Sequence, residues 1–273
     1  MKKETHKMNK TCFCTRWTVL LALLAAGVLI APLPSFAARP LITDDSGTVG
    51  KGKFQAELGL EWFTWKDTED GVRVKETGTE SSNVFTYGIS DCLDVVAGIP
   101  YDWAKARENG RTVFRENGFA DLSLETKWRF FERDGLGLAL KPGITFPIGD
   151  YKKGFGTGRV AYGLTFVATK DLGPFSFNFN GGYTRNENKL GEQKDVWSAS
   201  FAPTYELKEG LYIVGDTGFE RNADPNAETA PAYALVGVSY AVTGAVVLDV
   251  GIKFGLNKQE VDRAVTAGVT LNF

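Results

Sequence analysis

Histidine and cysteine are almost absent from this chain of 273 residues, which contains one histidine and three cysteines. His6, Cys12 and Cys14 all lie near the N-terminus, in a segment that we predict to be removed. The mature chain would then keep no histidine and a single cysteine, Cys92. An internal disulfide, a nucleophile activated by histidine and a zinc site with histidine ligands are therefore excluded for the mature chain.

The N-terminal segment has the pattern of a secretory signal peptide. Basic residues dominate positions 1–16, and an unbroken apolar run follows from Val19 to Ala31. Small residues at Ser35 and Ala37 then indicate a cleavage site. The apolar run is well short of the roughly 20 residues that a membrane-spanning helix needs, and no cysteine follows it that could carry a lipid anchor. We predict that residues 1–37 are cleaved and that the chain is exported.

Charge gives no indication of a nucleic-acid partner. Without residues 1–37 the chain keeps 26 of its 31 basic residues and 32 of its 33 acidic residues. The mature chain is therefore acidic, and no basic block remains that could bind nucleic acid.

Apolar and polar residues alternate along almost all of the remaining chain. In the stretch 54–62 the apolar side chains of Phe54, Leu58, Leu60 and Trp62 share one face, and the other face is mostly acidic. A period of two is typical of a β-strand with two different faces. Roughly twelve such segments of about 9–12 residues follow one another, with no convincing helix. This length suits a tilted strand that crosses a membrane.

The connections between these segments alternate between long and short. Long polar connections are expected at 66–80, 102–117, 150–159, 185–195, 221–229 and 257–260, and short ones at 90–91, 131–135, 170–174, 208–210 and 243–244. Such asymmetry is typical of outer-membrane barrels. An open edge would leave unpaired backbone groups in lipid. We therefore predict an all-β fold, a closed antiparallel up-and-down transmembrane β-barrel of about 12 strands, over residues 53–273.

Aromatic residues near strand ends, such as Trp62, Trp103 and Trp128, fit an interfacial girdle. Pro142 and Pro203 fit less well, because proline is awkward inside a central strand. A secreted soluble β-sandwich or lipocalin-like barrel is the alternative fold. The bulky apolar face of every strand and the persistent asymmetry of the loops favour the membrane barrel.

If the apolar faces contact lipid, the polar faces line a lumen. The lumen-facing candidates are Glu57, Glu61, Asp121, Glu125, Lys127, Arg129, Lys141, Asp216, Asp249 and Lys253, together with Asp94 and Glu206. A dozen strands enclose more room than side chains easily fill. Two interpretations remain open: a narrow pore of mixed charge, or a lumen closed by pairs of acids and bases.

No catalytic, cofactor-binding or metal site is predicted, and we expect that the chain is not an enzyme. Acids such as Asp121 and Glu125 share a face simply because they lie on the polar side of one strand, so they do not indicate a catalytic pair. The glycine-rich stretches 47–52 and 156–159 lack the spacing of a phosphate-binding loop. Asp44 and Asp45 have no further acidic ligands at the spacing of a calcium loop.

Residues 38–52 precede the first strand and contain adjacent acids and several glycines. Such residues are favoured in turns. We expect a periplasmic N-terminal segment on the side of the short turns, forming a turn that seats or plugs the barrel mouth.

Several stretches resemble a family of outer-membrane transporters assigned to the meta-cleavage pathway of phenol degradation. They are the sequence RPLITDDSGTVGKGKFQAE at 39–57, the stretches 118–130 and 141–150, and the last strand up to Phe273. This resemblance implies a β-barrel in the bacterial outer membrane that passes small aromatic or other hydrophobic compounds. It implies no residue-level site. The terminal Phe273 resembles the signal that such barrels present to the barrel-assembly machinery.

The partners expected are therefore outer-membrane lipid, the assembly machinery and a small solute. A channel or transporter is the first functional hypothesis. The alternative is a non-conducting structural or surface-binding barrel, and an outer-membrane enzyme is a third hypothesis.

Overall fold

The computed structural model describes residues 39–69 and 71–273. The predicted signal peptide, residues 1–37, thus lies outside the described residues. Most of the described chain is β-strand, and η1(Tyr151–Lys153) is a single turn of 3-10 helix. None of the helical structure in these two ranges is long and apolar enough to cross a membrane.

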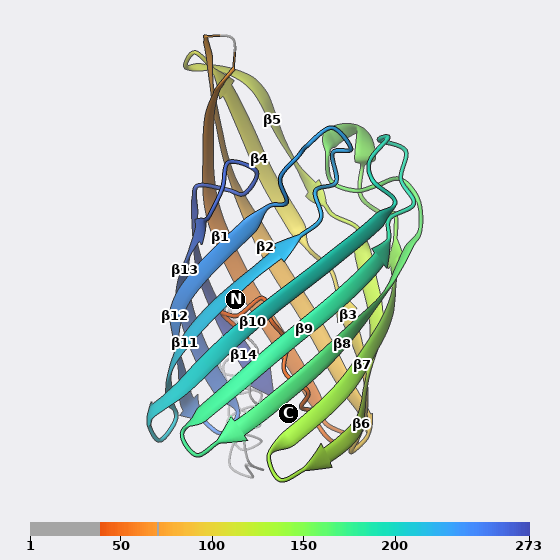
Figure 1. Ribbon diagram of the computed structural model, residues 1–273, viewed down its shortest axis with the longest axis vertical. Coiled ribbons are helices and arrows are strands. Elements are labelled where there is room, and N and C mark those ends of the chain that lie inside the picture. Colours follow the sequence, from red (N-terminus) through yellow and green to blue (C-terminus); the bar gives the residue numbers. More distant parts are fainter. Residues whose placement is uncertain (1–38, 70) are drawn as a thin grey trace, which may run out of the picture.

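The strands form one closed antiparallel barrel (Figure 1). Their bounds are β1(Phe54–Glu69), β2(Val72–Ser90), β3(Leu93–Gly98), β4(Tyr101–Glu108), β5(Arg111–Phe119), β6(Leu122–Arg133), β7(Leu136–Phe146), β8(Ala161–Leu172), β9(Phe175–Arg185), β10(Asp195–Lys208), β11(Leu211–Glu220), β12(Ala232–Thr243), β13(Val246–Gly255) and β14(Arg263–Asn272). Each strand from β6 to β14 pairs with its neighbours in sequence, β14 pairs with β1, and β1 pairs with β2. The ring of backbone hydrogen bonds is therefore closed.

The 14 segments make 12 barrel strands. β3 and β4 both pair with β2 and are separated only by residues 99–100, so together they form one strand of the wall. β5 and β6 are separated only by residues 120–121, and they pair with β4 and β3 respectively. The predicted architecture, a closed up-and-down barrel of about 12 strands, is confirmed.

The two ends of the barrel chain meet at the closing seam. Phe273 donates its backbone N–H to the carbonyl of Phe54 at 2.8 Å, and Phe54 donates back to Phe273 at 3.2 Å. Above this pair β1 and β14 stay in register from Gln55 opposite Asn272 to Thr64 opposite Arg263. The last residue of the chain therefore completes the ladder that closes the sheet.

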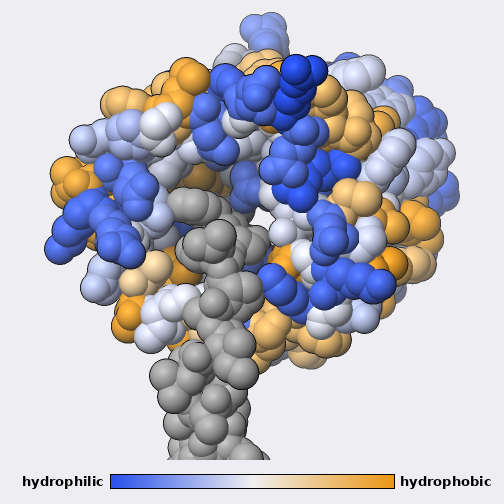
Figure 2. Space-filling model, turned by 90° about the horizontal axis from the view of Figure 1, so that it is seen from below, coloured by the Kyte–Doolittle hydropathy of each residue, from blue (hydrophilic) through white to orange (hydrophobic). Residues whose placement is uncertain are grey.

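Large apolar side chains face outward, and polar side chains face the interior. On β13, Leu248, Val250 and Ile252 are 48%, 50% and 44% exposed, whereas Asp249 between them is 7% exposed. Seen from the end with the short turns, apolar residues lie along the outer wall around a central opening (Figure 2). A soluble barrel has the reverse arrangement, with its large apolar side chains in the core. The observed arrangement is that of a barrel in contact with lipid.

Two of the predicted long loops are wrong. Residues 66–80 and 102–117 continue as strands, so that β1 and β2 run for 16 and 19 residues. These hairpins rise beyond the rest of the barrel at the end opposite the short turns (Figure 1). The stretches are polar because both of their faces leave the apolar belt, and polarity alone does not prevent backbone pairing. The other long connections remain loops, and the short turns stand as predicted.

Both prolines lie inside strands, and the pairing yields around them. Pro142 pairs with Leu164 of β8, but the ladder from β7 to β6 breaks between the pairs Gly143–Glu125 and Leu140–Trp128. Pro203 pairs with Phe177 of β9, and the ladder from β10 to β11 has a gap at the same place. Each proline therefore sits where one side of its strand already lacks regular pairing, because proline has no N–H to donate.

Candidate functional site

Residues 39–53, here called the inner segment, run inside the barrel before β1 begins. Starting at Arg39, the segment contacts side chains of β14, β11, β9, β8, β6, β7 and β3 in turn. At its end Gly52 donates its N–H to the carbonyl of Gly88 on β2. Most of the segment that we expected at the rim thus lies against inward-facing side chains of the wall.

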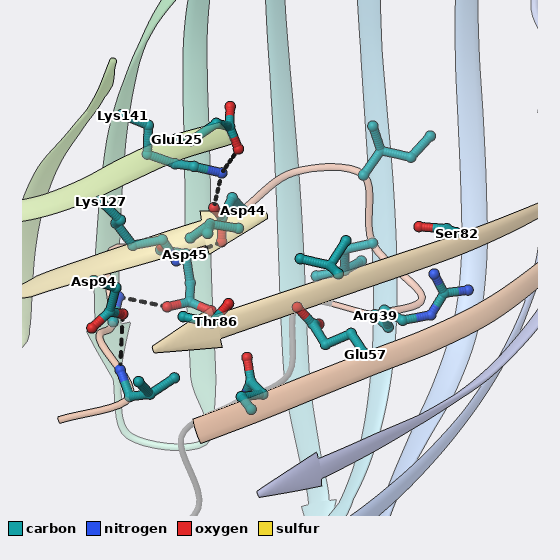
Figure 3. A pocket seen from close by; sticks show the side chains of 17 residues that line it. Arg39, Asp44, Asp45, Glu57, Ser82, Thr86, Asp94, Glu125, Lys127 and Lys141 are labelled. Atoms are coloured by element: carbon teal, nitrogen blue, oxygen red, sulfur yellow. Dashed lines mark hydrogen bonds and ion pairs between the residues drawn. The ribbon is translucent and has the colours of Figure 1, made fainter. Parts of the chain in front are cut away.

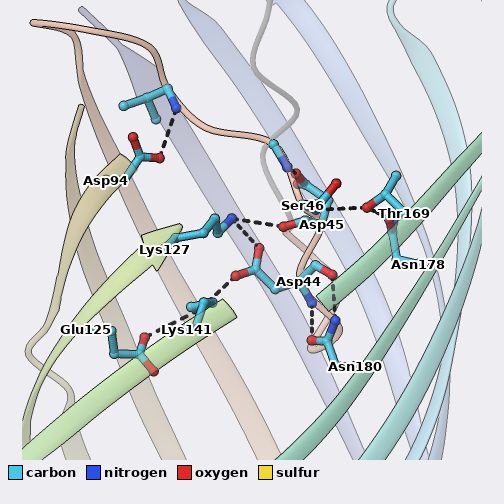
Figure 4. A network of polar contacts seen from close by, with 12 residues as sticks. Asp44, Asp45, Ser46, Asp94, Glu125, Lys127, Lys141, Thr169, Asn178 and Asn180 are labelled. Carbon is cyan, nitrogen blue, oxygen red and sulfur yellow. Dashed lines mark hydrogen bonds and ion pairs between the residues drawn. The ribbon is translucent and has the colours of Figure 1, made fainter. Parts of the chain in front are cut away.

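Asp44 is the centre of a polar network in this segment (Figure 4). Its carboxylate accepts hydrogen bonds from Lys127 on β6 at 2.8 Å and from Lys141 on β7 at 2.7 Å. Lys141 also lies 3.4 Å from the carboxylate of Glu125. The backbone N–H and C=O of Asp44 both bond to the side-chain amide of Asn180 on β9, at 2.8 Å each. One residue therefore binds three neighbouring strands to the inner segment.

The charge state of Asp44 follows from this setting. Burial raises the pKa of the carboxyl, but the ammonium groups of Lys127 and Lys141 outweigh burial and hold its pKa well below the usual range. Asp44 is therefore ionised at neutral pH. A buried charge of this kind is tolerated only while its partners stay in place.

Asp216 on β11 holds the segment at a second point. Its carboxylate accepts the N–H of Ile42 at 2.7 Å, and the N–H and hydroxyl of Thr43 at 2.8 and 2.7 Å. Tyr233 of β12 donates its hydroxyl to the same carboxylate at 3.1 Å. Thr43 is fully buried as a result. Two further contacts, from Ser46 to Thr169 and from Val49 to Asp94, continue the attachment toward the short-turn rim.

Arg39 occupies the wall opposite Asp216. Its guanidinium donates to the hydroxyl of Thr266 at 3.0 Å and lies 3.7 Å from the carboxylate of Asp249. Two glycines, Gly59 and Gly268, lie directly opposite each other on β1 and β14 beneath it. A Cβ atom on either glycine would overlap the guanidinium. The wall therefore has a hollow where Arg39 lies.

The same relation recurs along the inner segment. Gly237 of β12 leaves room for the ring of Pro40, Gly137 of β7 for the hydroxyl of Ser46, and Gly88 of β2 for the carbonyl of Gly50. Inward-facing glycines thus line the path of the segment on several separate strands. The wall and the segment have complementary shapes, so the segment has a defined seat.

We predict that Gly88→Ala unseats the end of the inner segment. The new Cβ would overlap the backbone carbonyl of Gly50, which cannot rotate away as a side chain can. Residues 49–53 should become accessible to trypsin at Lys51 and Lys53, as measured by mass spectrometry of the digest. Gly181→Ala on β9 is the matched control, because its Cβ would meet only the ring of Phe179 at 3.6 Å. Equal protection of both variants would contradict the seat at Gly88.

The ten lumen candidates fall into separate groups. Glu125, Lys127 and Lys141 meet around Asp44, and Asp216 and Asp249 hold other parts of the inner segment. Glu61 pairs with Lys253 at 2.9 Å, away from this cluster. The remaining three lie elsewhere, and their positions are set out next.

Glu57 lines a cavity beside the inner segment. Asp121 accepts the N–H groups of Gly149 and Thr157 and so fixes the loop between β7 and β8. Arg129 donates to the carbonyl of Asp91 at the short-turn rim. Of the two further candidates, Asp94 bonds Val49, and Glu206 accepts the hydroxyl of Tyr212 at 3.2 Å. The candidates thus form several small groups in place of one continuous charged surface.

Sequence reasoning missed the residues of the inner segment itself. Arg39, Thr43 and Asp44 were assigned to a turn at the rim, yet each contacts the barrel wall. Asn180 was also missed. Its inward position on β9 beside Asn178 was the available signal, since both amides are buried.

Cavities remain on both sides of the inner segment. One of about 210 Å³ lies between the segment and the wall that carries Glu57, Thr86 and Asp94 (Figure 3). Another of about 440 Å³ lies toward the short-turn rim, where Arg129, Phe175 and Val214 are among its lining residues. The segment therefore narrows the interior without filling it. Among the residues that the structure describes, no cluster of acids and cysteine has the composition of a metal site.

A family model described as "Putative MetA-pathway of phenol degradation" matches residues 37–273. The chain belongs to this family. The match covers the inner segment and every strand, so the resemblance inferred from short motifs is confirmed. No curated protein matches the chain.

Solved structures with a similar fold are outer-membrane barrels. The COG4313 outer membrane channel from Pseudomonas putida F1 has 15% identity and a TM-score of 0.65, with 84% of this chain and 98% of that chain covered. The translocator domain of the autotransporter NalP from Neisseria meningitidis has 12% identity and a TM-score of 0.50, covering 95% and 96%. The KdgM porin has 7% identity and a TM-score of 0.52, covering 80% and 99%. At these identities the likeness concerns the fold alone.

Proposed function

We propose that this member of the phenol-degradation family is an outer-membrane channel for small solutes, narrowed by its inner segment. The observation that carries the proposal is the pair of cavities beside residues 39–53, inside a closed barrel whose wall bears polar groups. A barrel of about eight strands is filled by its own side chains, whereas one of 12 strands has room to spare. Here that room is divided by a segment held through specific contacts.

Small aromatic compounds are the solute class that we propose. The family description supports this choice, because it refers to phenol degradation. The larger cavity offers the matching chemistry, since apolar side chains of Leu41, Phe175 and Val214 line it together with the cations Arg39 and Arg129. An aromatic acid could place its ring against the apolar surface and its carboxylate beside a guanidinium.

The orientation in the membrane belongs to the same proposal. The short turns would face the periplasm and the tall hairpins the cell exterior, as in other outer-membrane barrels. Cleavage of residues 1–37, export, and recognition of Phe273 by the assembly machinery complete it. We propose no catalytic role and no cofactor.

A non-conducting barrel is the second candidate function, and a specific observation favours it. The ion pairs of Asp44 with Lys127 and Lys141 join the inner segment to the wall in the middle of the barrel. If these contacts never open, the lumen stays closed and the tall hairpins become the functional part.

Swelling of liposomes that carry the purified chain separates the two functions. We expect faster swelling with the sodium salt of a small aromatic acid than with a sugar of similar mass, because only the acid fits both linings of the larger cavity. Heat-modifiable mobility on a gel provides the check that the barrel is folded. A folded barrel that gives no swelling with either solute would rule out the channel.

A further inference from the structure

The tall hairpins carry a basic surface on their outer side. We define the extension as residues 62–69, 72–79, 101–108 and 111–117, where β1, β2, β4 and β5 lie side by side. Side chains directly opposite each other in paired strands share one face of the sheet. The register therefore states which residues of the extension face outward.

The outer face begins with an aromatic row. Trp62, Thr79, Trp103 and Asn117 lie opposite one another across the four strands. Trp62 and Trp103 are 45% and 43% exposed. Below them the same face is apolar, with Leu60 and Phe119 exposed. Exposed tryptophans at the end of an apolar belt mark the boundary between hydrocarbon and headgroups.

Basic residues occupy the rows directly beyond the tryptophans. The next row contains Lys105 and Arg115, opposite each other and beside Thr77. The row after it joins Lys66, Lys75 and Arg107 across β1, β2 and β4, and Arg73 follows one row higher, opposite Thr68. We call this set of six cations the basic outer face; it comprises Lys66, Arg73, Lys75, Lys105, Arg107 and Arg115. By register, no acid lies on this side of the same rows.

The acids of these rows lie on the opposite face. Asp67 pairs with Val74, Glu76 with Trp65 and Ala106, and Glu116 with Ala104, all on the side that faces away from the cations. Glu116 is in addition bound by Lys153 of η1 at 3.0 Å. The extension therefore separates its charges, with cations outside and acids inside.

The cations of the basic outer face lack counter-ions within the protein. None of the six forms an ion pair with a carboxylate whose side chain the structure describes. Like charges that lie directly opposite on paired strands destabilise a sheet, and this face contains Lys66–Lys75, Lys75–Arg107 and Lys105–Arg115 in that relation. An external anion would remove the penalty.

The face is also hollowed where the tryptophans meet the cations. A groove of about 440 Å³ is lined by Trp62, Trp103, Thr77, Thr79, Lys105 and Arg115, among others. Hydroxyl groups form its floor, and aromatic and basic side chains stand beside it. This combination suits a phosphorylated sugar or headgroup, which offers anionic oxygens to the cations and acceptors to the hydroxyls.

We propose that the basic outer face binds the phosphorylated headgroups of lipid in the outer leaflet of the surrounding membrane. The acyl chains would lie along the apolar belt below the tryptophans, and the phosphates would reach the rows of cations. The proposal relies on the outer-membrane location proposed above, but it does not require that any solute passes the lumen.

Native mass spectrometry of the full chain, titrated with diphosphoryl lipid A, tests this proposal. A variant with Lys75→Gln, Lys105→Gln and Arg107→Gln should bind lipid A about a hundredfold more weakly, since each cation near an anionic lipid surface strengthens binding about fivefold. The matched control is Lys152→Gln, Lys208→Gln and Lys258→Gln, which removes the same charge from exposed positions elsewhere. The control should bind as the unchanged chain does.

Three results would overturn the proposal: equal affinity of the triple variant and the unchanged chain, equal weakening in the control, or inorganic pyrophosphate binding as tightly as lipid A. The last would assign the face to a free anion. Liposome swelling by the triple variant should match that of the unchanged chain. Failure of the channel and failure of lipid binding are therefore read in separate experiments.

Discussion

A variant in which Asp44 and Asp216 are both alanine should conduct ions several-fold better than the unchanged barrel. The two carboxylates hold the inner segment from opposite sides of its path, through Lys127 and Lys141 on one side and the backbone of residues 42–43 on the other. Once the segment leaves its seat, the two cavities join into one passage. Single-channel recording in planar bilayers measures the change.

The magnitudes favour release of the segment. Removing one partner of a buried ion pair costs about 3–5 kcal/mol, and Asp44 serves two lysines. Hydrogen bonds to a charged group contribute about 1.5–3 kcal/mol each, and Asp216 accepts three from the segment. The contacts that would remain, such as Ser46 with Thr169, are neutral and contribute roughly 0.5–1.5 kcal/mol each. The two carboxylates therefore supply most of the attachment.

The control removes two acids that do not bind the wall. Asp45 bonds the N–H of Gly47 within the segment, and Asp150 bonds the N–H of Lys152 at the start of η1. Asp45→Ala with Asp150→Ala should leave the conductance near that of the unchanged barrel. Trypsin cleavage after Arg39 and Lys51 reports release of the segment independently. Cleavage without a rise in conductance would mean that the segment does not set the width of the passage.

The fold could be predicted because two signals agree along the whole chain. Alternation gives the strands and their faces, and the unequal connections give the order of long and short loops. The prediction was wrong at 66–80 and 102–117, because polar residues such as Lys75 and Lys105 look like loop residues when only one apolar face is expected. Strands that leave the membrane have two polar faces, so alternation of hydropathy disappears while backbone pairing continues.

The interior could be predicted less well than the wall. Alternation identifies which residues of a strand face inward, but it does not state what they meet. Lys127 and Lys141 were candidates for a pore lining, whereas their partner Asp44 looked like a turn residue because it stands beside Asp45 and close to glycines. Its role depends on a contact between residues 83 and 97 positions apart. A single sequence contains no periodic signal for a contact of that kind.

Replacing Lys127 and Arg129 with alanine should shift the ion preference of the barrel toward cations. Lys127 neutralises Asp44 inside the barrel, so its loss exposes a carboxylate to the passage. Arg129 lines the larger cavity near the short-turn rim. A unit charge about 4 Å from a passing ion changes the energy of that ion by about 1 kcal/mol in water. Each lost cation should therefore change the permeability ratio about fivefold at low salt, measured from reversal potentials in a salt gradient.

Salt and a matched control separate this effect from a general change of charge. Lys208→Ala with Lys258→Ala removes the same charge from exposed positions in the turn after β10 and the loop after β13, so the reversal potential should stay where it is. The shift should shrink as salt rises, because screening shortens the reach of the lost cations. Conductance should not rise as in the variant without Asp44 and Asp216, since Lys141 still holds Asp44. Unchanged reversal potentials would show that ions do not pass Lys127 and Arg129, and the passage would then have to follow the wall that carries Glu57 and Asp94.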